Sequence, residues 1–199
     1  ISKIKKDIGW EPKINIDEVA FFGGTFDPPH IGHKKIIEFC KKEFKQIIIA
    51  PNKFPPCNIK KKPIASSIQR LEMLEMMFPE TNVIIDDYEL NSDTKSYTYY
   101  TLKYLINKYE LNSITLILGQ DQLNSINQWY RSDWIINNVE ILCFTRGEYK
   151  KTYFDKVSYV AFDYDISSSM IRNKIIDKQN VSVYLDDFIL EYIQQQRIY

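Results

Sequence analysis

The chain has 199 residues, a length that suits one domain. Its 26 Lys and Arg balance its 26 Asp and Glu, so the net charge of zero gives no reason to expect a nucleic acid or a membrane surface as partner. No apolar run approaches the roughly 20 residues that cross a membrane, and no secretion leader is visible, so we expect neither a membrane partner nor export.

Residues 1–18 are polar and mixed, and Gly9 and Pro12 interrupt any regular element, so we expect an irregular N-terminal extension there. From residue 19 onward, short apolar runs alternate with segments of helical spacing. In chain order the pattern predicts a strand at 19–22, a helix at 31–44, a strand at 46–50, a loop at 51–65, a helix at 66–78 and a strand at 83–85. It then predicts a helix at 98–109, a strand at 113–118, a helix at 129–136, strands at 139–144 and 157–161, and helices at 168–177 and 184–195.

This alternation is typical of an α/β fold. It predicts one domain over residues 1–199, built on a doubly wound parallel sheet with helices on both faces. Ligands of such sheets bind beyond the carboxyl ends of the strands, near the point where the strand order reverses. Two predicted strands run directly into glycine, at Gly23-Gly24 and at Gly119. We therefore expect the binding site at these two strand ends.

Cysteine and histidine are scarce. The three cysteines, Cys40, Cys57 and Cys143, are odd in number and widely spaced, which argues against a disulfide framework and favours a reducing, cytoplasmic compartment. The two histidines, His30 and His33, lie three residues apart, so any imidazole chemistry must use this pair. A zinc site would need a third His or a Cys pair, so we expect no protein-bound metal.

The most informative stretch, residues 23–33, reads GGTFDPPHIGH. Its glycines allow a ligand to approach the backbone N–H groups closely, and His33 lies near the start of the next predicted helix, where the dipole favours anions. His30 and His33 are spaced to face one site, and each imidazole can donate a hydrogen bond to a phosphate oxygen. A pair that merely caps the turn is the alternative, but the coincidence of features favours phosphate binding.

A second stretch, residues 165–172, reads DISSSMIR. Serines ahead of a helix are common N-caps, and capping alone would explain them. Their hydroxyls and the N–H groups of the first helical turn also bind phosphate, and Arg172 adds a fixed charge with bidentate geometry.

The two stretches together resemble motifs of the nucleotidylyltransferase superfamily, and within it of the bacterial-type nicotinate mononucleotide adenylyltransferases. Further segments are similar to that family in the same order along the chain. These are PNKFPP at 51–56, SYTYYTL at 96–102, Gly119-Gln120-Asp121 followed by Trp129-Tyr130, and the ending at 191–199. The resemblance therefore covers the chain from about residue 19 to the C-terminus.

Three positions depart from the family pattern. Ser169 stands where the family usually has Thr, which keeps the hydroxyl. Cys57 stands where a His is usual, and Lys53 or the lysines at 60–62 are candidate replacements for the missing imidazole. Arg146 belongs to a segment, residues 146–149, that matches the family's Arg-Pro-Gly-Tyr only loosely, so we do not assign it a role in the site.

The resemblance implies a Rossmann-like fold and a reaction of NAD biosynthesis. In that reaction the adenylyl group of ATP passes to nicotinate mononucleotide, giving nicotinic acid adenine dinucleotide and pyrophosphate. Phosphoryl-type transfer is catalysed mainly by positioning and charge stabilisation, so no covalent intermediate is needed. Mg²⁺ would arrive with ATP, held by phosphate oxygens and water.

The resemblance also implies roles for individual residues. The catalytic residues would be His30, His33 and Arg172. The ATP-binding residues would be Gly23, Gly24, Thr25, Phe26, Lys53, Gly119, Asp121, Ile166, Ser168 and Ser169. The mononucleotide-binding residues would be Thr98, Trp129 and Tyr130, with Trp129 stacking on the pyridine ring. Core packing is the alternative for Trp129, because Trp134 is nearby and only one indole need face a ligand.

Other functions remain open at this level. A related adenylyltransferase could act on nicotinamide mononucleotide or phosphopantetheine, and the HIGH letters at 30–33 also occur in class I aminoacyl-tRNA synthetases. An idle nucleotide-binding regulator on the same fold is a third alternative. The sequence leaves the choice between nicotinate and nicotinamide open, and likewise whether the chain forms a homo-oligomer.

Overall fold

The computed structural model describes residues 19–54, 62–93, 95–145, 154–162 and 164–199. Within these residues, six strands form one all-parallel sheet in the order β3-β2-β1-β4-β5-β6. The strands are β1 (Val19–Gly24), β2 (Gln46–Pro51), β3 (Val83–Ile85), β4 (Ile114–Gly119), β5 (Glu140–Thr145) and β6 (Val157–Ala161). The predicted parallel α/β fold is confirmed, whereas the proposed extension at 1–18 lies outside the described residues.

The helices are α2 (Ile31–Cys40), α3 (Ser67–Met77), α4 (Tyr88–Asn91), α5 (Thr98–Lys108), α6 (Gln120–Asn124), α7 (Ser132–Asn138), α8 (Ser168–Ile176) and α9 (Asp187–Gln196), with a 3₁₀ turn η1 (Ile126–Gln128). Local chemistry sets several starts. Ser66 accepts the Gln69 N–H at 3.2 Å, and the Gln69 side chain accepts the Ser66 N–H at 2.9 Å, which forms a capping box before α3.

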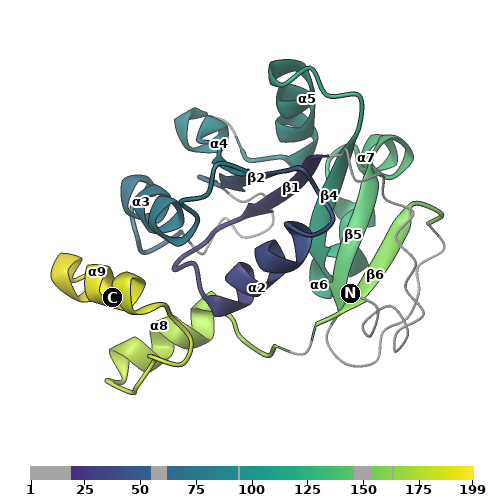
Figure 1. Ribbon diagram of the computed structural model, residues 1–199. Helices are drawn as coiled ribbons and strands as arrows, with labels where there is room; N and C mark the ends of the chain where they lie inside the picture. The colour runs from purple at the N-terminus through teal and green to yellow at the C-terminus, as the bar shows by residue number, and fades with distance from the viewer. Residues whose placement is uncertain (1–18, 55–61, 94, 146–153, 163) are drawn as a thin grey trace.

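Side-chain alternation along the strands divides the core into two layers. Phe22, Ile47 and Ile117 belong to one buried cluster, and Phe21, Ile48 and Leu116 belong to the other. The first cluster includes residues of α2, α3, α8 and α9, whereas the second includes residues of α5, α6 and α7. Figure 1 shows α2 in front of the sheet and α6 behind it. The prediction of helices on both faces is therefore confirmed.

Several predicted helix boundaries are wrong. The helix expected at 129–136 starts at Ser132, because the backbone of Trp129 is extended and Arg131 takes a left-handed conformation with φ of 56°. The helix expected at 184–195 starts at Asp187, and the one expected at 31–44 ends at Cys40 and gives way to turns. The short helices α4 and α6, with four and five residues, were not expected because they hold too little sequence to display a helical period.

Cys40 and Cys143 are buried free thiols. Burial raises the pKa of Cys143 to about 12, so it stays a neutral thiol. Cys57 lies outside the described residues. Among the described helices, none has the length and apolar character that crossing a membrane requires.

The strand order creates a crevice at one point of the sheet edge. β1 pairs with β2 on one side and with β4 on the other, with Phe22 opposite Ile117. The chain therefore reverses its direction of winding between β1 and β4, so the glycines that end these two strands lie side by side. This is the switch point at which ligands of doubly wound sheets bind.

Candidate active site

Two cavities open at the carboxyl ends of β1 and β4. The histidine cavity, of about 460 Å³, is lined by residues that include His30, His33 and Arg172. The tryptophan cavity, of about 500 Å³, is lined by residues that include Trp129 and Thr98. Both cavities share the lining residues Gly23, Gly24, Asn52 and Gln122. The two cavities therefore meet at the end of β1.

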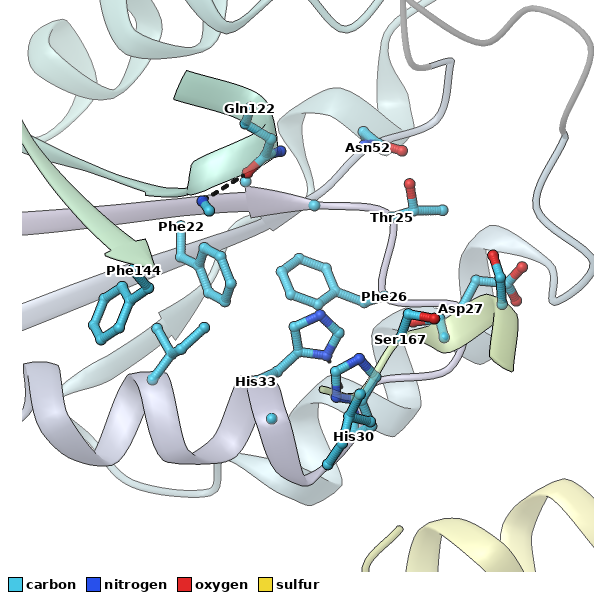
Figure 2. Close-up of a pocket in the computed structure, with 18 of the residues that line it drawn as sticks. Phe22, Thr25, Phe26, Asp27, His30, His33, Asn52, Gln122, Phe144 and Ser167 are labelled. Carbon is cyan, nitrogen blue, oxygen red and sulfur yellow. Dashed lines mark hydrogen bonds between the residues drawn. The ribbon is translucent and has the colours of Figure 1, made fainter. Parts of the chain in front are cut away.

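The two histidines form a stacked pair at the start of α2. His30 is the N-cap residue, with extended backbone, and its ring lies 3.7 Å from the ring of His33, centroid to centroid, at an angle of 22°. The backbone N–H of His30 donates to Nδ1 of His33 at 3.2 Å. Neutral His33 therefore carries its proton on Nε2, which makes that nitrogen a hydrogen-bond donor. Figure 2 shows His33 between Phe26 and His30.

Close packing holds this pair in place. The ring of His33 lies 4.9 Å from that of Phe26, and Phe26 has a left-handed backbone with φ of 51°. A Cβ on Gly24 would lie 2.9 Å from the Phe26 ring, and a Cβ on Gly32 would lie 3.0 Å from the His30 ring. A side chain at either position would force the packed ring of Phe26 or His30 to shift.

The serine–arginine turn before and within α8 reaches the same cavity. Ser167 caps the helix by accepting the Met170 N–H at 3.2 Å. Ser168 instead donates from its hydroxyl to the carbonyl oxygen of Pro28 at 2.9 Å, and Arg172 donates from Nη1 to the carbonyl oxygen of Asp27 at 2.6 Å. Helix capping therefore explains Ser167 alone. The other two residues tie α8 to the loop that carries the histidines.

Asp27 is a site residue whose importance was not expected. Its buried carboxylate accepts the backbone N–H groups of Ile64 and Ala65 at 2.9 and 3.0 Å, and the hydroxyl of Tyr199 at 2.7 Å. The Arg172 guanidinium lies 3.5 Å away. Burial and this carboxylate raise the pKa of Tyr199, so the tyrosine remains a donor. One carboxylate thus joins three distant parts of the chain beside the histidine cavity.

Arg70 of α3 is another unexpected site residue. Its side chain is buried, and Nη1 donates to the carbonyl oxygens of Thr25 at 2.7 Å and Asn52 at 2.8 Å. Burial lowers the pKa of Arg70, while the Asp27 carboxylate opposes that shift. The guanidinium therefore fastens the loop after β1 to the loop after β2.

The tryptophan cavity brings together the three residues expected to bind the mononucleotide, Thr98, Trp129 and Tyr130. Trp134 does not line it, because its ring packs edge-on against Tyr99 at 5.2 Å. Of the two indoles, Trp129 is thus the one available to a ligand. Among the described residues that line this cavity there is no Lys, Arg or His.

Glu89 supplies a buried carboxyl group to the wall of the tryptophan cavity. One of its oxygens accepts the Thr101 hydroxyl at 2.6 Å. Burial raises the pKa of Glu89, which the hydrogen bonds from Thr101 and Ser96 partly oppose. The carboxyl therefore retains its proton to a higher pH than an exposed glutamate does.

The remaining predicted residues fall into three groups. Thr25, Gly119, Ile166 and Ser169 line the histidine cavity along with the residues already placed there. Lys53 and Asp121 line neither cavity, because the Lys53 ammonium donates to the Ser92 carbonyl oxygen at 3.1 Å and Asp121 is exposed on α6. Lys60, Lys61 and Arg146 lie outside the described residues, whereas Lys62 lines the histidine cavity.

The described residues do not build a cage for a resident cation. No group of three His, Cys, Asp or Glu side chains among them could hold a metal ion. The buried carboxylate nearest the histidines, that of Asp27, already accepts three hydrogen bonds.

Comparison with known proteins gives consistent matches. The sequence matches the cytidylyltransferase-like family over residues 21–174. A protein of Listeria monocytogenes named probable nicotinate-nucleotide adenylyltransferase is 33% identical over 186 residues, covering 92% of this chain and 97% of the relative. A protein of the same name from Legionella pneumophila is 34% identical over 209 residues, covering 91% and 98%.

Solved structures share the fold. The nicotinic acid mononucleotide adenylyltransferase of Plasmodium falciparum, complexed with NaAD, superposes with a TM-score of 0.77 at 18% identity and covers 92% of this chain and 97% of its own. A Vibrio parahaemolyticus protein described as a nicotinate-nucleotide adenylyltransferase superposes with a TM-score of 0.66 at 22% identity, covering 92% and 95%.

Proposed function

Since this chain belongs to the cytidylyltransferase-like family, and within it to the nicotinate-nucleotide adenylyltransferases, we propose that it makes nicotinic acid adenine dinucleotide from ATP and nicotinate mononucleotide. A phosphate oxygen of the mononucleotide attacks the α-phosphorus of ATP, the bond to the β-phosphate breaks, and pyrophosphate leaves. The observation that carries the proposal is the pair of cavities that meet at Gly23 and Gly24. One offers phosphate donors and the other an aromatic wall.

The histidine cavity receives the triphosphate of ATP. The Nε2–H group of His33 and the imidazole of His30 bind its phosphates, and Ser168, Ser169 and Arg172 bind the part that leaves as pyrophosphate. Donors held in place before the reaction stabilise negative charge that develops in the transition state without reorganising. The bonds from Ser168 and Arg172 to the loop of residues 27–28 supply this rigidity.

The tryptophan cavity receives the mononucleotide. The pyridine ring stacks on Trp129, a contact of about 0.5–1.5 kcal/mol beyond burial. Backbone N–H groups near Thr98 and Tyr130 bind its carboxylate. The described lining of this cavity holds no Lys, Arg or His, so we expect neutral donors to distinguish nicotinate from nicotinamide.

Mg²⁺ would be supplied with ATP, and phosphate oxygens and water would hold it while it balances the charge of the phosphates. We expect the enzyme to work in the cytoplasm, which its two buried free thiols support.

The net charge of zero favours neither nucleic acid nor a membrane surface as a partner. Size-exclusion chromatography with light scattering tests whether it forms a homo-oligomer.

Turnover of purified protein tests the proposal. ATP and Mg²⁺ are supplied with nicotinate mononucleotide, nicotinamide mononucleotide or phosphopantetheine in parallel, and pyrophosphate release and the mass of the product are followed. We expect the dinucleotide from nicotinate mononucleotide as the fastest reaction. Turnover of phosphopantetheine alone would assign the chain to another adenylyltransferase, and ATP binding without any turnover would make it a regulator.

A further inference from the structure

The two cavities share one wall, and the proposed reaction must take place against it. If ATP occupies the histidine cavity and the mononucleotide occupies the tryptophan cavity, the phosphates that react can meet only where both cavities have the same lining. That shared wall consists of Gly23, Gly24, Asn52 and Gln122. Side chains in it are the ones that reach both substrates.

Two of the four residues in the shared wall are glycines, so the side-chain groups at the meeting point are the amides of Asn52 and Gln122. No Lys, Arg or His of the described chain belongs to the shared wall. Figure 2 shows both amides beside the end of β1. The side chains of the shared wall can therefore offer the reacting phosphates the N–H donors of two neutral amides.

The Gln122 amide has a defined orientation. Its Oε1 accepts the backbone N–H of Gly119 at 3.1 Å, the bond drawn as a dashed line in Figure 2. Because the Gly119 N–H engages the oxygen, Nε2 is the group of this amide that can donate to a ligand in the cavities that Gln122 lines. A donor fixed in this way can bind a phosphate oxygen without reorganising.

We propose that Gln122 is a phosphate-binding catalytic residue, which donates from Nε2 to the phosphate that is transferred. The proposal rests on the proposed function, because it places the two substrates in the two cavities. The sequence resemblance implied that the neighbouring Asp121 binds ATP, but Asp121 lines neither cavity. Among the residues of α6, Gln122 is the one that lines both cavities.

The Gln122→Glu variant tests the proposal sharply. A glutamate keeps an oxygen to accept the Gly119 N–H, so the local structure is retained, but it replaces the donor with a negative oxygen facing the phosphates. We expect kcat to fall roughly 10²-fold, the effect of losing one preorganised donor. Gln122→Met removes the donor without adding charge, and should lower kcat while the calorimetric affinity for ATP changes little, because the histidine cavity still holds the triphosphate.

The matched control is Asn124→Asp on the same helix. Asn124 lines neither cavity, and its Oδ1 accepts the Gln120 amide at 2.8 Å, a bond that an aspartate retains. It introduces the same charge without reaching the substrates, so its kcat should match the wild type.

The outcomes separate the two proposals. Wild-type turnover of nicotinate mononucleotide is measured first, and its absence would overturn the proposed function. With an active wild type, normal kcat in Gln122→Glu and Gln122→Met would overturn the role of Gln122 alone. An equal loss in Asn124→Asp would overturn it too, since the effect would then come from charge on α6.

Discussion

At the scale of single residues, one backbone hydrogen bond decides what His33 can do. A histidine whose Nδ1 is free can exist in either neutral tautomer, but here Nδ1 accepts the His30 N–H. The neutral imidazole therefore holds its proton on Nε2, and it could donate a hydrogen bond to an anion without carrying a positive charge. The three-residue spacing in the sequence makes this bond possible, because it places His33 at the third position of α2.

The first prediction is that His33→Ala lowers kcat by about 10²–10³-fold, because one preorganised donor to the reacting phosphates is lost. Folding should be nearly unaffected, since alanine is the best helix former. Steady-state kinetics and thermal unfolding test both statements. Glu38→Ala, on the exposed side of the same helix, is the control and should keep wild-type kcat. Normal turnover in His33→Ala would remove this residue from the mechanism.

Glu89 leads to a prediction about pH. Burial raises its pKa in the folded protein above the ordinary value of 4.5. The folded state therefore binds the proton more tightly than the unfolded state, so the contribution to stability is complete below pH 4.5 and is lost as the pH rises through the folded-state pKa. Glu89→Gln keeps an acceptor for Thr101 and carries no titratable proton.

We thus expect the free energy of unfolding of the wild type, relative to Glu89→Gln, to decrease as the pH is raised from below 4.5 to neutrality. Urea unfolding of both proteins across this range measures it. A difference that stays constant with pH would show that the carboxyl has the same pKa in both states.

At the scale of secondary structure, α3 acts on the site through a single buried side chain. Arg70 holds the carbonyl oxygens of Thr25 and Asn52, which belong to the loops after β1 and β2. These bonds fix the two loops relative to each other, and Asn52 in one of them lines both cavities. A helix that contributes no residue to either cavity thereby shapes both.

We predict that Arg70→Met destabilises the protein by about 2–5 kcal/mol, because two buried carbonyl oxygens lose their donor. Turnover should fall as well, since the loops are no longer fastened together. Arg70→Lys keeps the charge but lacks the planar fork, so it should lie between the wild type and Arg70→Met in both properties. Chemical denaturation and kcat are the measurements, and wild-type stability in Arg70→Met would contradict the clamp.

Element prediction from the sequence succeeded where an apolar run or a helical period was clear. The strand at 157–161 agrees with β6 at both ends, and the helix at 98–109 agrees with α5 to within one residue. The start of α7 was misplaced because Arg131, its N-cap residue, has a left-handed backbone, so the helix can begin only at Ser132. A glycine at this position would have indicated such a conformation, whereas an arginine gives no sign of it.

At the scale of the whole molecule, Tyr199 reaches the loop that carries the histidines. Tyr199 donates to the Asp27 carboxylate across 172 positions of sequence, and the same carboxylate holds the backbone of Ile64 and Ala65. The contacts between α3 and α9 bring the end of the chain to this point. The histidine loop, the segment at residues 64–65 and the C-terminus are thus joined at one carboxylate.

We predict that Tyr199→Phe lowers the free energy of unfolding by about 1–3 kcal/mol and also lowers kcat, because a buried carboxylate oxygen loses a donor beside the reaction centre. Tyr192→Phe is the matched control. That hydroxyl donates to Glu72 at an exposed site, so its loss should cost less stability and leave kcat unchanged. Equal effects of the two substitutions on kcat would contradict a special role for Tyr199.

The sequence by itself determined the alternation of strands and helices, and with it a parallel sheet whose switch point carries the glycine ends of β1 and β4. It also determined the two motifs proposed to bind phosphate, at residues 23–33 and 165–172. It named Trp129 and Trp134 as the two indoles of which one could stack on a ligand. These features are encoded locally, because periodicity, turn chemistry and motif spacing involve residues within a few positions of one another.

Only the tertiary structure decided how those parts combine. It showed that Trp129 lines a cavity whereas Trp134 packs against Tyr99. It also showed that Lys53 and Asp121 line neither cavity and that Gln122 belongs to the shared wall. It also revealed the hydrogen bonds of Arg70, Asp27 and Tyr199, whose partners lie 18 to 172 positions away. Such contacts depend on how whole elements pack against one another, and no short window of sequence contains both partners.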